Sequence, residues 1–74
     1  MYMEIWEKIK NLRKDKGLTG EQLGTLVGCS RQAIGRYESG ARVPDLDTLA
    51  SIAVALEVEA IALLPDWFLE AGWN

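Results

Sequence analysis

The side chains that most often carry covalent or metal chemistry in proteins are almost absent from this sequence. Among its 74 residues there is no histidine, and Cys29 is the single cysteine. An intramolecular disulfide, a zinc site of cysteine and histidine, and nucleophilic catalysis by a Cys–His or Ser–His–Asp group are therefore excluded. We expect no metal, no cofactor and a reduced, cytoplasmic setting.

Carboxylates are the other residue type that could do acid–base chemistry. Several of them follow residue 44, in patterns typical of helix caps and solvated helix surfaces, with no partner base around them. They include Asp45, Asp47, Glu57 and Glu59. The sequence therefore predicts a protein that is not an enzyme and has no catalytic residue.

The charged residues are distributed unevenly along the chain. All eight Lys and Arg residues lie between Lys8 and Arg42, and residues 1–43 also carry five acidic side chains. Residues 44–74 carry six acidic side chains and no basic one. The net charge of −3 thus conceals a basic half that could face nucleic-acid phosphates. The most apolar stretch, residues 49–64, is too short and too charged to cross a membrane.

Apolar residues recur at helical spacing along the chain, and no segment alternates with a period of two, so we predict an all-α fold. Residues 1–74 are expected to form a single domain. Five helices are predicted, at residues 3–16, 19–27, 31–39, 46–56 and 59–64. The spacing assigns Leu26 and Leu46 to the apolar sides of the second and fourth helices. Pro65 is expected to end the fifth.

The most informative stretch is LTGEQLGTLVGCSRQAIGRYESG, residues 18–40. Two short helices are separated there by Gly-Cys-Ser, the spacing of a helix-turn-helix. Thr19 begins a Thr-x-x-Gln capping box, and Ser30 is a good N-cap for the next helix. Gly24 is small enough to let the helices approach closely, and Gly28 tolerates a positive φ in the turn.

The sequence resembles the lambda-repressor-like family of Cro/C1-type helix-turn-helix proteins. The resemblance covers about residues 4–64 and rests on LRKDKGLT, EQLGTLVGCSRQAIGRYESG, RVPDLDTLASIAVAL and IALL, which occur in this order. It implies a compact five-helix domain whose second and third helices form the helix-turn-helix. It also implies a sequence-specific DNA-binding transcriptional regulator, repressor-like, that reads the major groove with residues 30–39 and binds an operator as a dimer.

The resemblance also implies which residues contact double-stranded DNA. Base contacts are implied for Arg31, Gln32 and Arg36, since Gln can pair with adenine and Arg with guanine. Backbone contacts are implied for Thr19, Ser30, Ser39 and Arg42. Arg13 and Glu38 match two residues that form a structural ion pair in many family members.

Two glycines depart from the family pattern. Gly20 stands where the family often has a Gln that contacts a phosphate, and Gly35 stands where it often has Ser or another polar residue. Both departures remove potential DNA contacts, and Gly35 costs its helix about 1 kcal/mol relative to alanine. Either weaker DNA binding or a closer approach of the backbone to DNA would follow.

The last ten residues, PDWFLEAGWN, carry Trp67, Phe68 and Trp73. Two interpretations of this aromatic tail stay open. The side chains could fold back over the first and fifth helices, against Trp6 or Tyr2, or they could form a self-association surface. In a symmetric dimer the two recognition helices would lie about 34 Å apart, which matches half-sites one DNA turn apart.

An alternative function is a protein-interaction module, similar to an antitoxin, with weak DNA affinity. In that case the acidic half and the aromatic tail would bind a partner protein. Gly20, Gly35 and the net charge favour this alternative. The polar side chains expected to contact DNA, Arg31, Gln32, Arg36 and Arg42, oppose it.

Overall fold

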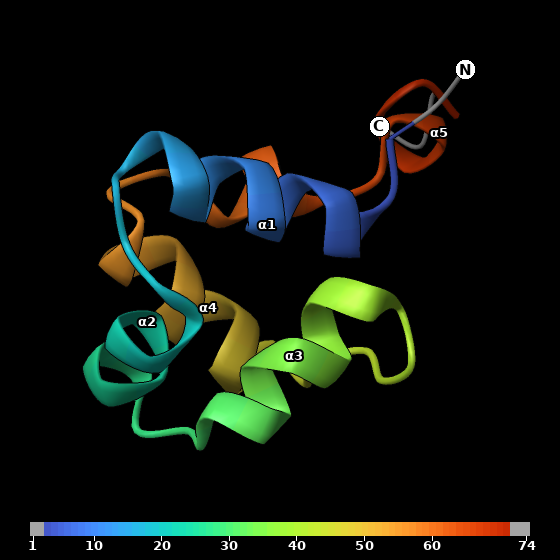
Figure 1. Ribbon diagram of the computed structural model, residues 1–74. Helices are drawn as coiled ribbons and strands as arrows, with labels where there is room; N and C mark the ends of the chain where they lie inside the picture. Colours follow the sequence, from blue (N-terminus) through green and yellow to red (C-terminus); the bar gives the residue numbers. More distant parts are fainter. Residues whose placement is uncertain (1–2, 72–74) are drawn as a thin grey trace.

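The structure, a computed structural model, describes residues 3–71 (Figure 1). These residues form five α-helices and one 3₁₀ helix, with no strand among them. The elements are α1 (Ile5–Asp15), α2 (Gly20–Val27), α3 (Arg31–Ser39), α4 (Leu46–Ala55), the 3₁₀ helix η1 (Ala60–Leu63) and α5 (Asp66–Leu69). The predicted all-α fold is therefore confirmed. Within the same residues, no helix has the length and apolar composition needed to cross a bilayer.

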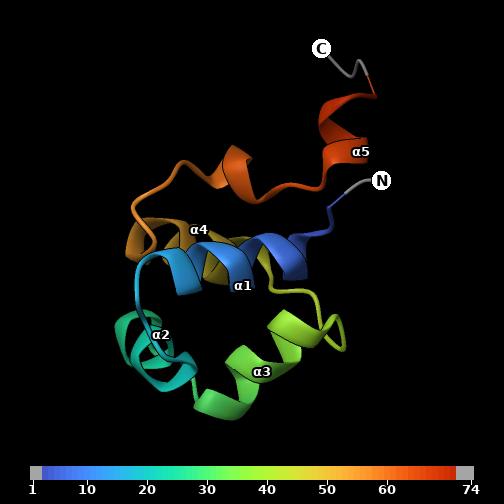
Figure 2. The same cartoon turned by 45° about the horizontal axis from the view of Figure 1, so that its top comes forward.

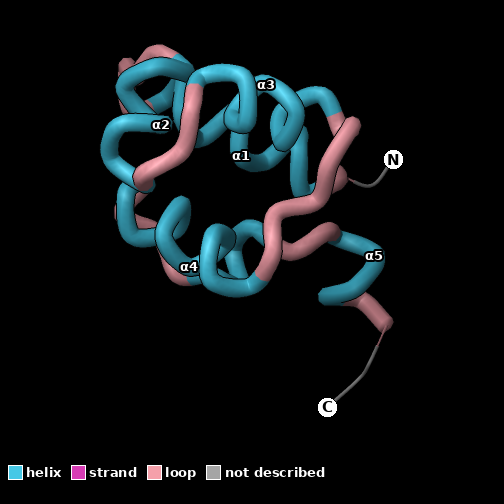
Figure 3. Tube along the Cα trace, turned by 90° about the horizontal axis from the view of Figure 1, so that it is seen from below, coloured by secondary structure: helices cyan, strands magenta, loops and turns pink. Residues whose placement is uncertain are grey.

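The helices enclose one core and are joined by short loops (Figure 3). α1 packs against α3 and η1, while α2 packs against α3 and α4. Figure 1 shows α1 on one side of the molecule and the α2–α3 turn on the other. Each fully buried side chain contributes about 1.5–3 kcal/mol relative to exposure. The largest of these are Ile9, Leu23, Ile34, Ile52, Leu56 and Leu63.

Three helices begin at the N-cap residues that the sequence predicts. Thr19, Ser30 and Asp45 each accept a hydrogen bond from the backbone N–H three residues later, at 3.0, 3.0 and 2.8 Å. Gly28 and Gly40 end α2 and α3 with φ of 75° and 81°, a conformation that glycine adopts without strain. Local sequence signals therefore define both ends of α3.

The first helix begins two residues later than predicted, at Ile5. Glu4 is its N-cap, and the Glu4 N–H donates to Glu7 Oε1 at 3.2 Å. Met3 lies outside the helix because its backbone pairs with the C-terminal region. Its N–H donates to Asp66 Oδ2, and its carbonyl accepts from the Asp66 N–H, both at 3.1 Å.

The C-terminal region differs from the prediction in the kind of helix it forms. The segment predicted as an α-helix is the 3₁₀ helix η1, only four residues long, which is the usual length for the tighter i→i+3 geometry. Pro65 does end this segment, but it also precedes α5, which was not predicted. Proline suits that place because the first turn of a helix leaves its N–H groups unpaired.

Two leucines assigned to apolar helix sides lie on the surface instead. Leu26 in α2 is 60% exposed and Leu46 in α4 is 78% exposed. Leu46 is the first residue of α4, and burial begins one turn later at Leu49. Helical spacing alone therefore overestimates how far the core extends along each helix.

Candidate nucleic-acid interface

A close backbone contact at Gly24 holds the helix-turn-helix together. The Gly24 carbonyl accepts a hydrogen bond from the Cys29 N–H at 2.8 Å. A Cβ atom on Gly24 would lie 2.6 Å from the Cys29 carbonyl oxygen, so only glycine fits. The close approach that the sequence predicts is therefore made between α2 and the backbone of the turn.

α3 has a buried side and an exposed side. Ile34 and Tyr37 face the core, at 0% and 6% exposure. Arg31, Gln32 and Arg36 are exposed, and within residues 3–71 no hydrogen bond or ion pair occupies their side chains. Gln32 and Arg36 are one helical turn apart and lie on the same side of α3. These three residues, here called the reading surface, present free donors from a rigid helix.

The beginnings of α2 and α3 add donors of a different kind. The hydroxyl oxygens of Thr19 and Ser30 accept the capping hydrogen bonds, which leaves each hydroxyl proton as a donor for an incoming group. Helix N-termini also carry unpaired backbone N–H groups and a partial positive charge. Both ends are therefore suited to bind an anion such as a phosphate.

Ser39 and Arg42 lie at the end of α3 and in the loop to α4. The Ser39 hydroxyl donates to the Arg36 carbonyl at 3.2 Å and accepts from the Ala41 N–H at 3.4 Å, so it shapes the loop. The Arg42 side chain is exposed. The pKa of the nearby Asp45 carboxyl is lowered mainly by the Thr48 backbone hydrogen bond and to a smaller degree by the Arg42 charge.

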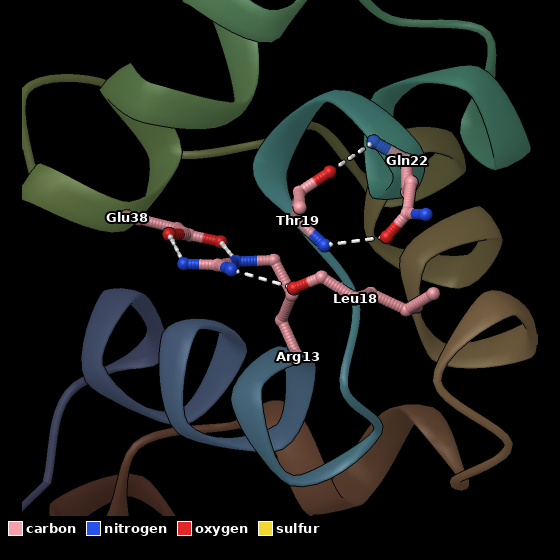
Figure 4. A network of polar contacts seen from close by, with 5 residues as sticks. All are labelled: Arg13, Leu18, Thr19, Gln22 and Glu38. Carbon is pink, nitrogen blue, oxygen red and sulfur yellow. Dashed lines mark hydrogen bonds and ion pairs between the residues drawn. The ribbon is translucent and has the colours of Figure 1, made fainter.

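Arg13 and Glu38 join α1 to the last turn of α3 (Figure 4). Arg13 Nε lies 2.6 Å from Glu38 Oε2 and Nη2 lies 3.0 Å from Oε1, while Nη1 donates to the Leu18 carbonyl at 2.7 Å. The two side chains are only 13% and 10% exposed. The hydrogen bond to Glu38 raises the pKa of the Arg13 guanidinium. The pair therefore orients α3 and does not face outward.

The two glycines that depart from the family pattern are not required by packing. A Cβ on Gly35 would meet nothing within 4 Å, and one on Gly20 would meet only Ile34 Cγ2, at 3.8 Å. Gly35 is exposed on α3, beside the reading surface. Either position could therefore carry a side chain without disturbing the core.

The aromatic tail lies away from the reading surface. Figures 1 and 2 show α5 beside the beginning of α1, on the opposite side of the molecule from the α2–α3 turn. Trp67 is 51% exposed, its Nε1 donates to Glu4 Oε1 at 3.1 Å, and its ring meets Phe68 edge-on at 6.1 Å. The tail thus folds back onto the residues before α1. Tyr2 and Trp73 lie outside the described residues.

Comparison with known proteins gives a consistent family. The helix-turn-helix family profile matches residues 9–63. The chain is 40% identical over 62 residues to the HTH-type transcriptional activator BcrR of Enterococcus faecalis, which covers 84% of this chain and 30% of BcrR. It is 35% identical over 65 residues to the cryptic phage CTXphi transcriptional repressor RstR of Vibrio cholerae, covering 88% of this chain and 58% of RstR. The chain thus spans less than two thirds of either relative.

A solved structure gives the same result. The P22 c2 repressor, in complex with the synthetic operator 9T, superposes with a TM-score of 0.81 at 29% identity, covering 84% of this chain and 94% of that one. The residues matched by the family profile, 9–63, include α2, the turn and α3. The chain belongs to the lambda-repressor-like helix-turn-helix family.

Proposed function

We propose that this chain is a DNA-binding transcriptional regulator that places α3 in the major groove of double-stranded DNA. The observation that carries the proposal is the reading surface, where Arg31, Gln32 and Arg36 are exposed and unpaired within the described chain. A Gln carboxamide matches the edge of adenine and an Arg guanidinium that of guanine. The capped, rigid helix would hold these groups in register with the bases.

Phosphate contacts would fix the orientation of α3 on the duplex. The N-termini of α2 and α3, at Thr19 and Ser30, and the exposed Arg42 are the groups suited to this role. Ser39 would contribute indirectly, because its hydroxyl holds the loop that carries Arg42. The P22 c2 repressor, with the same fold, is bound to an operator. We further propose a repressor-like action through occupation of a promoter.

We also propose that the chain binds DNA as a symmetric dimer through η1 and α5. Ile61, Trp67 and Leu69 are 47%, 51% and 37% exposed there, away from the reading surface. Exposed apolar side chains that gather in a patch commonly mark association surfaces, and these three are the candidates for such a patch. Sedimentation equilibrium without DNA should give a dimer that Trp67→Ala weakens, and a monomer at high micromolar concentration would exclude a preformed dimer.

The test is selection from a randomised pool of DNA duplexes, with affinities measured by fluorescence anisotropy at two salt concentrations. We expect a two-fold symmetric motif to be enriched. Arg36→Ala should lower affinity for that motif by about 10- to 100-fold and relax preference at one base position in each half-site. Lys10→Ala removes the same charge from an exposed position on α1 and is the matched control.

A folded protein that enriches no motif, even at low salt, would refute the proposal. The second candidate function, the antitoxin-like module, would then be favoured, with α5 binding a partner protein. The exposed apolar side chains of α5 support that candidate, together with the absence of side chains at Gly20 and Gly35. Salt separates the two functions, because phosphate neutralisation makes DNA affinity fall steeply with salt and an apolar interface does not.

A further inference from the structure

Trp6 lies in the first turn of α1, and its ring covers Gly40 at the end of α3. A Cβ atom on Gly40 would lie 3.1 Å from Cδ2 and 3.2 Å from Cε2 of the Trp6 ring. Gly40 also has a φ of 81°, which residues with a side chain rarely adopt. The indole therefore packs directly on the Gly40 backbone, where a side chain would be both strained and crowded.

Gly40 begins the loop that carries Arg42, so its position decides where this loop starts. The Arg42 N–H donates to the Arg36 carbonyl at 3.2 Å, which folds the loop back onto the last turn of α3. The Ser39 hydroxyl donates to the same carbonyl. Ala41 and Arg42 are both exposed, so these backbone contacts and the Trp6 ring, not burial of loop side chains, hold this part of the loop.

The C-terminal region in turn holds the backbone around Trp6. Asp66 pairs with the backbone of Met3 on one side of Trp6 and with the Lys8 ammonium, at 2.7 Å, on the other. Lys8 also donates to the Leu64 carbonyl at 2.6 Å. We call these contacts of Met3, Lys8, Leu64 and Asp66 the terminal clamp. The clamp fixes the first turns of α1, from which the Trp6 side chain extends.

We infer that Trp6 is a positioning residue for DNA binding: its ring closes over Gly40 and fixes the loop from which Arg42 reaches a backbone phosphate. This inference rests on the proposed function. A loop that is ordered before binding loses less conformational entropy when Arg42 engages DNA. Without the ring, Arg42 keeps its charge but must be ordered at each binding event.

The test is a double-mutant cycle on DNA affinity, measured with the selected duplex. Trp6→Ala should weaken binding about 3- to 10-fold, the range for ordering one flexible side chain and its loop. Trp6→Phe, which keeps a ring, should restore most of this affinity. In an Arg42→Ala background, Trp6→Ala should have almost no further effect, because the two residues act through one contact. Destabilisation of the fold alone would weaken binding equally in both backgrounds.

A second measurement retains Trp6 and so does not depend on the stability of Trp6→Ala. In a protein carrying Trp67→Phe and Trp73→Phe, Trp6 is the only tryptophan left, and anisotropy first establishes the duplex concentration that saturates this protein. Duplex DNA should reduce acrylamide quenching of Trp6, and Arg42→Ala should abolish this change at saturating DNA. Equal affinity losses in both Arg42 backgrounds, or the same quenching change in Arg42→Ala, would overturn the inference alone. Failure of every variant, wild type included, to bind DNA would overturn the proposed function and the inference together.

Discussion

Basic side chains are exposed in the reading surface and paired within the fold in the terminal clamp. On α3, the side chains of Arg31 and Arg36 are exposed without a partner in the described chain. At the clamp, Lys8 is only 13% exposed and is bound by Asp66 and a backbone carbonyl. The clamp cation has its hydrogen-bond donors directed inward, so it stabilises the fold. The cations of α3 remain available for a ligand.

Arg13 and Glu38 resemble the clamp in chemistry, although Glu38 belongs to α3. Glu38 is paired inside the fold, whereas the cations of α3 are exposed. Of the changes considered, disrupting the Arg13–Glu38 pair should have the largest effect on stability. Arg13→Ala leaves the Glu38 carboxylate, 10% exposed, without its partner, at a cost of about 3 kcal/mol in the free energy of unfolding. Urea denaturation followed by circular dichroism measures this directly.

Lys10→Ala is the control for this prediction, because an exposed cation changes stability by no more than about 0.5 kcal/mol. Replacing both partners, with Arg13→Met and Glu38→Leu, should recover much of the loss because no unpaired charge remains. A loss below about 1 kcal/mol in Arg13→Ala would mean that the Glu38 carboxylate is readily hydrated, and the pair would not orient α3.

Two glycines of the helix-turn-helix provide the next prediction, because the same substitution should have opposite effects. Gly24→Ala places a Cβ against a backbone oxygen that cannot move easily and should cost about 1–3 kcal/mol. Gly35→Ala meets open space and should stabilise α3 by up to about 1 kcal/mol. Thermal melting of the two variants compares them directly. If Gly35→Ala instead lowers the melting temperature, the space beside Gly35 is not open in the free protein, and the prediction is wrong.

Gly35→Ala also tests why α3 has a glycine beside the reading surface. If the backbone must approach DNA closely there, affinity should fall although the protein melts at a higher temperature. If the glycine only removes a contact, affinity should stay the same or rise. The two outcomes separate stability from recognition at one residue.

The sequence predicts α3 to the residue because its signals are local. Ser30 and Gly40 mark its two ends, and the structure has both of them at those ends. The resemblance led to the expectation that Arg13 and Glu38 pair, and the structure brings them together. The ends of α3 and the Arg13–Glu38 pair could therefore both be predicted from the types of a few residues at fixed positions in the sequence.

The terminal clamp and the Trp6 contact had no such signal. Met3 and Asp66 are 63 positions apart, and neither belongs to a spacing pattern that indicates pairing. The aromatic composition of the tail predicted packing or association, but not that Asp66 would bind the backbone before α1. One interpretation placed the tail against Trp6 or Tyr2, but nothing in the sequence indicated that the Trp6 ring packs on Gly40. Such contacts depend on how the whole chain folds, which local periodicity does not reveal.

The pH dependence of stability should separate the terminal clamp from the reading surface, which contains no carboxyl group. The pKa of the Asp66 carboxyl is lowered from 3.8 by its hydrogen bond to Lys8 and then by the one from the Met3 N–H. A carboxyl with a lowered pKa stabilises the fold fully above its unfolded pKa, and this contribution is lost as the pH falls through the lower folded value. Asp66→Asn should therefore melt below the wild type at pH 7, and the difference should shrink below pH 4.

Asp45 and Glu57 also have lowered pKa values, so acid should destabilise the Asp66→Asn variant as well, but with a shallower slope. The comparison between the two proteins removes this common part, because both carboxyls are present in each. Melting temperatures followed by circular dichroism between pH 7 and pH 3 give the difference. A difference that stays constant with pH would mean that Asp66 acts through its shape and its backbone contact with Met3, and that its charge contributes nothing to holding α5 against α1.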